Sequence, residues 1–378
     1  MTSNFSKRDT SIMKGFAIIC IVFHNYFHWL YPSPGENEFN CSPGNVDRLF
    51  EMLGQQPGEF INLLFSYFGH YGVQLFIFVS GFGLATSMMR RPVGWGSFML
   101  HRMKKLYPLL LTGIVFYTFG KIVMESKMLS SWEVKEIGLK LLLVHTLFPN
   151  SGMSVCGPWW FFGLVFQLYL LFPLLFRCMH RWGWKAFWVV LLVSYLLIFL
   201  FREWIHLNHG EVLMQNAPGH LPEFCFGIMM AFSKDKKLHL GWLVLALVLF
   251  IWGNFAPGFY PFTFLSLCVI AVFVVEGIKG RKRKRTPSHL RSFHLVEGQA
   301  VPFSVLNYFG GLSMQIFVVH GFLRKPVLKV EGWTTGAWWH LCSAVIYFLI
   351  IWAVALAAKP FYEFMVRQLD RIGSKRQS

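Results

Sequence analysis

Long apolar runs separated by short polar stretches repeat along the whole chain. An α-helix rises about 1.5 Å per residue, so most of these runs can cross a hydrocarbon core of about 30 Å, although the sixth and seventh are short. The pattern predicts an all-α, polytopic membrane protein of about ten transmembrane helices. The predicted spans lie near residues 11–31, 62–89, 106–124, 158–178, 184–201, 217–232, 239–253, 259–277, 302–323 and 336–358.

One further apolar segment does not fit this pattern. Residues Glu136 to Phe148 include Lys140 and His145. We expect the segment to lie at the outer surface or to re-enter rather than to cross. No polar stretch between the runs reaches the size of a domain, so a single membrane domain over residues 1–378 is expected, with no appended soluble domain. The first run lacks a small-residue cleavage site, which favours an uncleaved first span over a signal peptide.

Composition supports the membrane interpretation. Hydrophobic residues make up 55% of the 378 residues and charged residues only 14%, which is unlike the composition of a soluble domain. Of the 35 Lys and Arg residues, 26 fall in loops or termini on the side where the N-terminus would lie. The loop Pro32 to Phe60 is acidic instead. Because positive charge collects on the cytoplasmic side, both termini are predicted to be cytoplasmic.

The net charge of +17 does not indicate nucleic-acid binding, because it follows this loop pattern. The run Lys279 to Arg291 is interpreted as a topology signal that contacts anionic lipid. The seven cysteines contain no C-x-x-C pair, so no metal site is predicted from them. Cys41 and Cys156 both fall in predicted outer loops, where a disulfide between them is left open.

Polar residues form a stripe on the first span. Lys14, Asn25 and His28 share one face at about 100° per residue, and His24 lies beside it, about 15 Å from Lys14 along the axis. Ionisable groups at membrane depth usually face protein or a water-filled cavity. His24 is therefore either a hydrogen-bonded core histidine or a functional residue. The spacing of His24 and His28 also fits a metal or haem pair, but no second histidine pair stands at matching depth, so no metal is predicted.

A second polar cluster lies at the inner entrance of the third span. Arg102 and Lys105 are three residues apart on one helix face, followed by Tyr107 and Pro108. Such a face can clamp phosphate groups, Arg through paired hydrogen bonds and Lys as a point charge. Ordinary positive charge on the inner side is the alternative interpretation.

These residues belong to a set of motifs, and through them the chain resembles the integral membrane acyltransferase 3 family over nearly its whole length. Lys14 and His24 stand at the family's spacing of a basic residue and a histidine. GVQLFIFVSGF (72–82) is similar to the second-span signature, and Arg102 to Pro108 to the basic pair followed by Y-P. Trp160 to Pro173, LPEFCFGIMMA (221–231) and LSMQIFVVH (312–320) match later segments in order.

The resemblance implies an O-acyltransferase that moves an acyl group, most often acetyl, from cytoplasmic acyl-CoA to a hydroxyl of an envelope glycan or related acceptor. It implies His24 as the catalytic residue and a multi-pass location in a bacterial inner or plasma membrane. Acyl-CoA would be a co-substrate, and no permanently bound cofactor is expected. Acyl-CoA binding is assigned to Lys14, Arg102, Lys105 and Tyr107, and supporting roles to Asn25, His28, Ser80, Trp160, Gln167, Tyr169, Glu223 and His320.

The chain departs from the family pattern at several of these positions. Lys14 and Lys105 replace the commoner arginines, which keeps the charge but loses the planar fork. Gln74 replaces a frequent Asp, and Val165 and Phe166 replace acidic residues. A carboxylate that would orient His24 is therefore missing from those places, and Glu223 is the remaining intramembrane acid.

Two other function classes stay open on the sequence. A transporter or flippase of a lipid-linked sugar or small solute would explain the spans and the polar stripe, although not the ordered motifs. A haem-binding electron carrier would use the histidines. Trp29 and Tyr31 can stack on a sugar, but anchoring at the membrane interface is the more common role of such residues.

Overall fold

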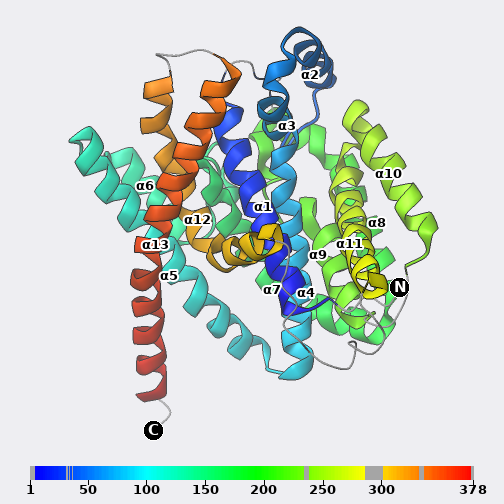
Figure 1. The fold of residues 1–378 in the computed structure, drawn as a ribbon. Helices are drawn as coiled ribbons and strands as arrows, with labels where there is room; N and C mark the ends of the chain where they lie inside the picture. The colour runs from blue at the N-terminus through cyan, green and yellow to red at the C-terminus, as the bar shows by residue number, and fades with distance from the viewer. Residues whose placement is uncertain are drawn as a thin grey trace.

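The computed structural model describes residues 5–30, 33, 35, 37–233, 238–285, 301–331 and 336–375, and these contain no β-strand. Short 3-10 turns precede several of the helices, and the helices pack side by side in one bundle (Figure 1). The helices are α1 (Lys7–Phe27), α2 (Pro43–Gln55), α3 (Phe60–Phe68), α4 (Gly72–Arg90), α5 (Trp95–Glu125), α6 (Ser131–Leu141), α7 (Trp160–Trp182), α8 (Trp184–His209), α9 (Ala217–Phe232), α10 (Leu240–Phe255), α11 (Tyr260–Arg285), α12 (Val301–Glu331) and α13 (Ala337–Lys375).

The all-α polytopic fold is confirmed. Each predicted span coincides with a helix, and within the described residues eight helical segments are long and apolar enough to cross a membrane. The exceptions are the sixth and seventh predicted spans: α9 and α10 have 16 residues each. At about 1.5 Å per residue they reach only about 24 Å. The second span, Pro57–Arg90, is interrupted by a 3-10 turn at Gly69–Tyr71, which the sequence pattern did not predict.

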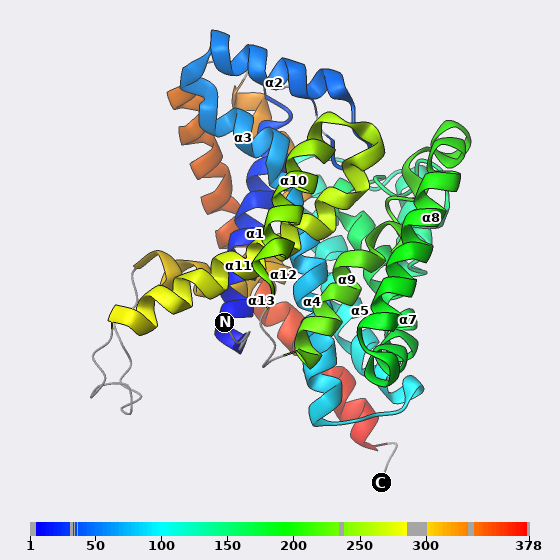
Figure 2. The same ribbon diagram turned by 90° about the vertical axis from the view of Figure 1, so that its right-hand side faces the viewer.

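The ends of the bundle differ. Helices α2 and α3 lie at one end, and both chain termini lie toward the opposite end (Figures 1 and 2). Termini on the same side are what an even number of crossings requires. Which end is cytoplasmic stays a prediction from the distribution of Lys and Arg.

Glycines allow the central helices to approach closely. A Cβ on Gly15 of α1 would lie 1.8 Å from the carbonyl oxygen of Leu306, and one on Gly310 of α12 would lie 1.8 Å from that of Ser11. Helices in membranes associate through such close backbone contact, because lipid supplies no hydrophobic drive between them. The pair α4 and α9 repeats the arrangement: Gly81 and Gly227 face each other's helix backbones.

The segment between α5 and α7 does not cross the bundle. Helix α6 has 11 residues and is followed by a 3-10 turn at His145–Leu147. Lys140 is fully buried and donates to the carbonyl oxygens of Ser151 and Gly152 at 3.2 and 3.1 Å. Burial lowers the pKa of Lys140 to about 8. Burial, together with the charge of Lys140, lowers the pKa of His145 to about 3, so His145 is neutral.

The sequence left open a disulfide between Cys41 and Cys156. Among the described residues this disulfide is absent, and both cysteines are free thiols. Cys41 lies 3.9 Å from the carbonyl oxygen of Asn254 on α10, whereas Cys156 lies against Gly321 on α12. Tyr31 and part of the basic run, residues 286–291, lie outside the described residues.

We expect Gly310→Ala to destabilise the protein, because its Cβ would overlap the Ser11 carbonyl and force α1 and α12 apart. Overpacking of this kind costs about 1–3 kcal/mol. The apparent Tm of the purified protein in detergent measures the effect. The neighbouring Gly311→Ala is the matched control, since its Cβ would meet nothing within 4 Å. Equal Tm values for the two variants would contradict the packing role of Gly310.

Candidate active site

His24 is buried in the bundle with a defined tautomer. Its side chain is 1% exposed, and Nδ1 lies 2.9 Å from the carbonyl oxygen of Ser66 on α3. A carbonyl only accepts, so Nδ1 carries the hydrogen and the neutral imidazole has its lone pair on Nε2. Ser66 is in the last turn of α3, where helix carbonyls begin to lose their intrahelical donors. The Ser66 carbonyl thus orients His24. It takes the place of the orienting carboxylate that the sequence lacks at Gln74, Val165 and Phe166.

Three more histidines surround His24. The ring centroid of His28 lies 4.9 Å away, and its Nδ1 donates to the His24 carbonyl oxygen at 2.6 Å. His70, from the 3-10 turn before α4, meets His24 edge to face at 5.6 Å. His320 of α12 is near enough to interact with His24 electrostatically. Sequence reasoning missed His70; the only signal was its place directly before the G-V-x-L-F motif.

His320 repeats the arrangement of His24. It is fully buried, and its Nδ1 donates to the Phe317 carbonyl oxygen at 2.7 Å, so Nε2 again has the lone pair. Among the described residues, this Nε2 has no hydrogen-bond partner. The hydroxyl of Tyr347 on α13 donates to the His320 carbonyl oxygen at 2.6 Å and fixes the backbone there. A second neutral imidazole with an available basic nitrogen therefore lies in the same region.

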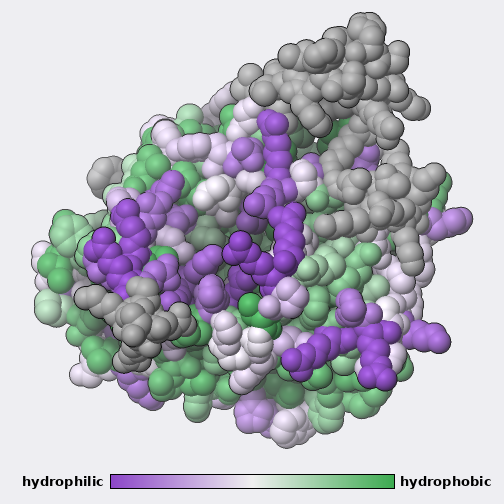
Figure 3. Space-filling view, turned by 90° about the horizontal axis from the view of Figure 1, so that it is seen from below, coloured by the Kyte–Doolittle hydropathy of each residue, from purple (hydrophilic) through white to green (hydrophobic). Residues whose placement is uncertain are grey.

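The predicted basic residues line one cavity at the end of the bundle that holds the termini. Lys14, Arg102 and Lys105 surround a space of about 640 Å³, together with Ser80 and Tyr169. A neighbouring cavity of about 580 Å³ shares Lys14 and adds further cations. Hydrophilic side chains gather in the middle of this face of the molecule (Figure 3). The cations that line the second cavity are Lys7, Lys14, Arg90 and Arg91.

Arg102 is held in place at this cavity by Phe98. Its guanidinium lies over the Phe98 ring, 5.2 Å from the centroid. Its Nε is shielded from solvent and has no hydrogen-bond partner in the part of the chain that the structure describes. Lys104, by contrast, points to α13 and pairs with Asp370 at 3.3 Å. The spacing of Arg102 and Lys105 thus places both side chains on the cavity and Lys104 away from it.

An apolar layer separates the cavity from the histidines. Phe161 and Met314 line the cavity. The Phe161 ring lies 5.1 Å from that of Phe317, which lies 5.5 Å from that of His320. A short run of aromatic contacts through Phe161 and Phe317 therefore leads from the cavity to His320. Tyr107 does not line either cavity and packs partly buried against the core.

Two of the expected supporting residues hold the loops at the opposite end. Gln167 donates to the side chain of Asn216 and accepts from the Ala217 backbone N–H at 2.9 Å, which ties α7 to the start of α9. Trp160 stacks on His220 with ring centroids 5.7 Å apart. Through these contacts, Gln167 and Trp160 hold together the helices around the site.

Glu223 is not placed to orient His24. It is fully buried and pairs with His220 on its own helix, Oε1 to Nδ1 at 2.7 Å. His220 also contacts the Met214 carbonyl oxygen at 2.9 Å through Nε2. Asn25, the remaining supporting residue, donates to the Ile21 carbonyl oxygen within α1 at 3.0 Å.

A sequence model of a protein family, described as an acyltransferase domain, matches residues 10–357 of this chain. The chain belongs to the acyltransferase 3 family. The match includes the cavity residues from Lys14 to Tyr169 and the histidines from His24 to His320. Membrane acyltransferase activity therefore replaces transport as the function class. Comparisons with curated proteins and with solved structures gave no match.

Gly69→Ala is expected to impair this acyltransferase by displacing His24. A Cβ at position 69 would lie 2.6 Å from both the His24 Cβ and the Cys20 carbonyl oxygen. Misplacement of a catalytic group by about 1 Å can cost about a hundredfold in rate. Acyl-CoA consumption per folded molecule measures the loss. Gly96→Ala, whose Cβ would meet nothing within 4 Å, is the control. Full activity of Gly69→Ala would contradict the positioning of His24 described here.

Proposed function

We propose that the protein transfers an acyl group from cytoplasmic acyl-CoA to a hydroxyl of an envelope glycan or related acceptor at the outer side. One observation carries this proposal: the cavity lined by Lys14, Arg102 and Lys105 and the oriented His24 are connected by a single helix, α1. Lys14 and His24 lie about 15 Å apart along its axis. A ligand with phosphates at one end and a reactive carbonyl at the other fits this separation.

The positive charge of the two adjoining cavities supports the binding of acyl-CoA there. Coenzyme A is an anion with several phosphate groups, and up to six Lys and Arg side chains line the two adjoining cavities. Arg102, with a solvent-shielded Nε donor, suits a phosphate oxygen, and Lys14 and Lys105 add point charges. The thiol arm would then extend past Phe161 and Met314 toward the histidines.

The chemistry assigned to His24 is general base catalysis. Nε2 would take the proton from the acceptor hydroxyl while the hydroxyl oxygen attacks the thioester carbonyl. Collapse of the tetrahedral intermediate breaks the C–S bond, and the protonated imidazole returns the proton to the departing thiolate. The reaction is balanced without any other reactant. The Ser66 carbonyl would hold the ring and stabilise its protonated form, since Nδ1–H donates to it in both states.

A two-step route through an acyl-histidine is the alternative. His24 Nε2 would attack the thioester carbonyl, the C–S bond would break, and the CoA thiolate would leave an acylimidazolium. The acceptor hydroxyl would then attack the acyl group and displace the neutral imidazole, and its proton would pass through a base to the thiolate. The second step needs a base other than His24. His320 has a basic Nε2 without a partner among the described residues and supplies a candidate for that role.

For the acceptor, the outer end of α1 offers an aromatic platform. Trp29 is 60% exposed, and the Arg324 guanidinium lies over its ring at 4.5 Å. Arg324 is also anchored to α1 through the Asn25 carbonyl oxygen at 2.7 Å. Such a surface suits a sugar ring. Acetyl as the acyl group and a bacterial inner or plasma membrane as the location rest on the family resemblance.

His24→Asn should abolish transfer without unfolding the protein. The amide N–H can replace Nδ1–H at the Ser66 carbonyl, whereas the basic nitrogen is lost. Removal of a general base lowers the rate about 10²–10⁴-fold. The measurement is radiolabel from acetyl-CoA transferred into envelope material by inside-out membrane vesicles at matched expression.

Propionyl-CoA and longer acyl-CoA donors are tested in parallel, because the sequence does not determine the length of the acyl chain. Thioester consumption by wild type but not by His24→Asn supports the proposal. If the wild type consumes none of the donors, acyl transfer from CoA is wrong for this chain. If His24→Asn is as active as the wild type, the assignment of His24 as the base is wrong.

Arg102→Gln and Lys105→Gln should raise KM for acyl-CoA, with a smaller effect on kcat. A hydrogen bond to a charged group contributes about 1.5–3 kcal/mol, so we expect about a ten- to hundredfold rise for Arg102→Gln. Lys104→Gln removes the same charge two residues away, but Lys104 pairs with Asp370 and lines neither cavity. Steady-state kinetics with a fixed acceptor compares the three. Equal effects in all three would indicate nonspecific charge attraction instead of a site.

A further inference from the structure

Two adjoining apolar cavities lie between α8 and α10. These two helices are on a different side of the bundle from α12 (Figure 1). Their volumes are about 300 and 510 Å³. They share Trp188, Trp242, Leu265 and Val269, so they form one continuous groove, called here the α8–α10 groove. The rest of its lining is apolar except for Tyr195 and Ser266. No part of the proposed reaction uses this groove.

The groove lies at membrane depth. It follows α8 from Trp184 to Phe199, which is about 22 Å at 1.5 Å per residue, and α8 is one of the candidate spans. The hydrocarbon core is about 30 Å thick, so most of the groove lies within it. An apolar surface at that depth is covered by hydrocarbon, supplied either by a lipid chain or by another transmembrane helix.

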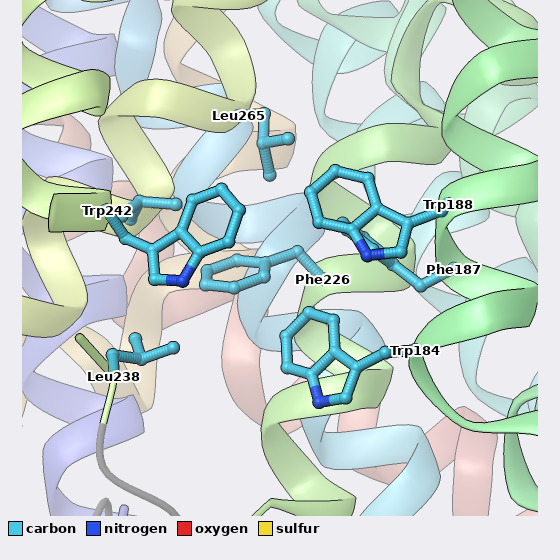
Figure 4. Close-up of a pocket in the computed structure, with 8 residues that line it drawn as sticks. Trp184, Phe187, Trp188, Phe226, Leu238, Trp242 and Leu265 are labelled. Carbon is cyan, nitrogen blue, oxygen red and sulfur yellow. The ribbon is translucent and has the colours of Figure 1, made fainter.

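The width of the groove excludes a helix. Trp188 from α8 and Trp242 from α10 stack across it with ring centroids 5.6 Å apart, and Phe226 of α9 lies between the two walls (Figure 4). Packed helices need about 8–10 Å between their axes, and a helix with side chains is about 10 Å wide. The two indole rings contact each other and close the middle of the groove, so a helix cannot enter it, whereas a flexible hydrocarbon chain can lie along the rings and fill the apolar spaces on either side of them.

The charge at one end of the groove indicates the headgroup. Trp184 is at the start of α8, and Lys185 and Arg181 flank it, both exposed. The Arg181 guanidinium lies 5.5 Å from the centroid of the Trp182 ring. Cations beside tryptophans at the end of a span are typical of the level of lipid phosphates. This end is in the predicted cytoplasmic half of the molecule.

We propose that the α8–α10 groove is a binding site for an anionic phospholipid of the inner leaflet. One acyl chain lies in the groove against Trp188 and Trp242, and the phosphate lies beside Lys185 and Arg181. The site is separate from the acyl-CoA cavity, and its test does not depend on the proposed reaction.

The groove tryptophans allow a direct test. The protein is reconstituted into phosphatidylcholine nanodiscs that contain increasing amounts of phosphatidylglycerol with brominated acyl chains, and tryptophan fluorescence is recorded. Brominated phosphatidylcholine is the comparison. We expect brominated phosphatidylglycerol to quench at a several-fold lower mole fraction. The Trp188→Phe/Trp242→Phe double variant should lose this preferential component. The Trp132→Phe/Trp338→Phe variant should retain it, because those residues are 55% and 81% exposed and lie on other helices.

Charge is tested separately with Arg181→Gln/Lys185→Gln, which should remove the preference for phosphatidylglycerol while quenching at saturation persists. If both brominated lipids quench the wild type equally and the Trp188→Phe/Trp242→Phe variant changes nothing, only bulk lipid contacts the groove. If variants fold poorly, native mass spectrometry of the wild type after delipidation decides the matter. Retained phosphatidylglycerol in excess of phosphatidylcholine supports the site, and absence of such retention overturns it.

Discussion

The rest of the structure depends on the close approach of α1 and α12. Gly15 and Gly310 each face a backbone carbonyl of the other helix, at distances that leave no room for a side chain. This contact brings His24 of α1 and His320 of α12 into one buried region. It also fixes the position of Lys14 relative to Met314, and both residues line the basic cavity. In a membrane the association of two helices depends on close van der Waals packing of their surfaces. The hydrophobic effect does not drive it, because the surrounding lipid is as apolar as the side chains.

A second backbone contact determines the chemistry of His24. The second span changes from α-helix to 3-10 turn at Gly69, where the chain passes directly against α1. The same region presents the Ser66 carbonyl to Nδ1 of His24. Catalytic histidines are often oriented by a carboxylate, which also stabilises the positive charge that forms on the ring. A neutral carbonyl gives the orientation and tautomer with less charge stabilisation.

The sequence predicted the parts of this arrangement that follow from periodicity. Each apolar run became a helix, and Lys14, Arg102 and Lys105, assigned together from spacing and family motifs, line one cavity. What it did not predict depends on contacts between distant segments. His70 meets His24 only because the second span is broken, and nothing in an apolar run reveals a 3-10 turn of three residues. Glu223 was left by elimination as the intramembrane acid that could orient His24. Its partner is instead His220, one turn away on the same helix.

The separation of the two halves of the site limits how the reaction can proceed. The cavity to which we assign the phosphates opens among the cations at one end, whereas His24 is 1% exposed and lies about 15 Å further along α1. Between the cavity and His320 lie the rings of Phe161 and Phe317, with centroids 5.1 Å apart and planes tilted by 57°. A thioester that passes from this cavity toward His320 must pass or move these rings, and water has little access to the buried histidines. Because water is the competing acceptor in any acyl transfer, the same layer that slows entry of the donor also protects the thioester from hydrolysis. We therefore infer that the aromatic layer, and not the histidine alone, makes this site suited to transfer instead of hydrolysis.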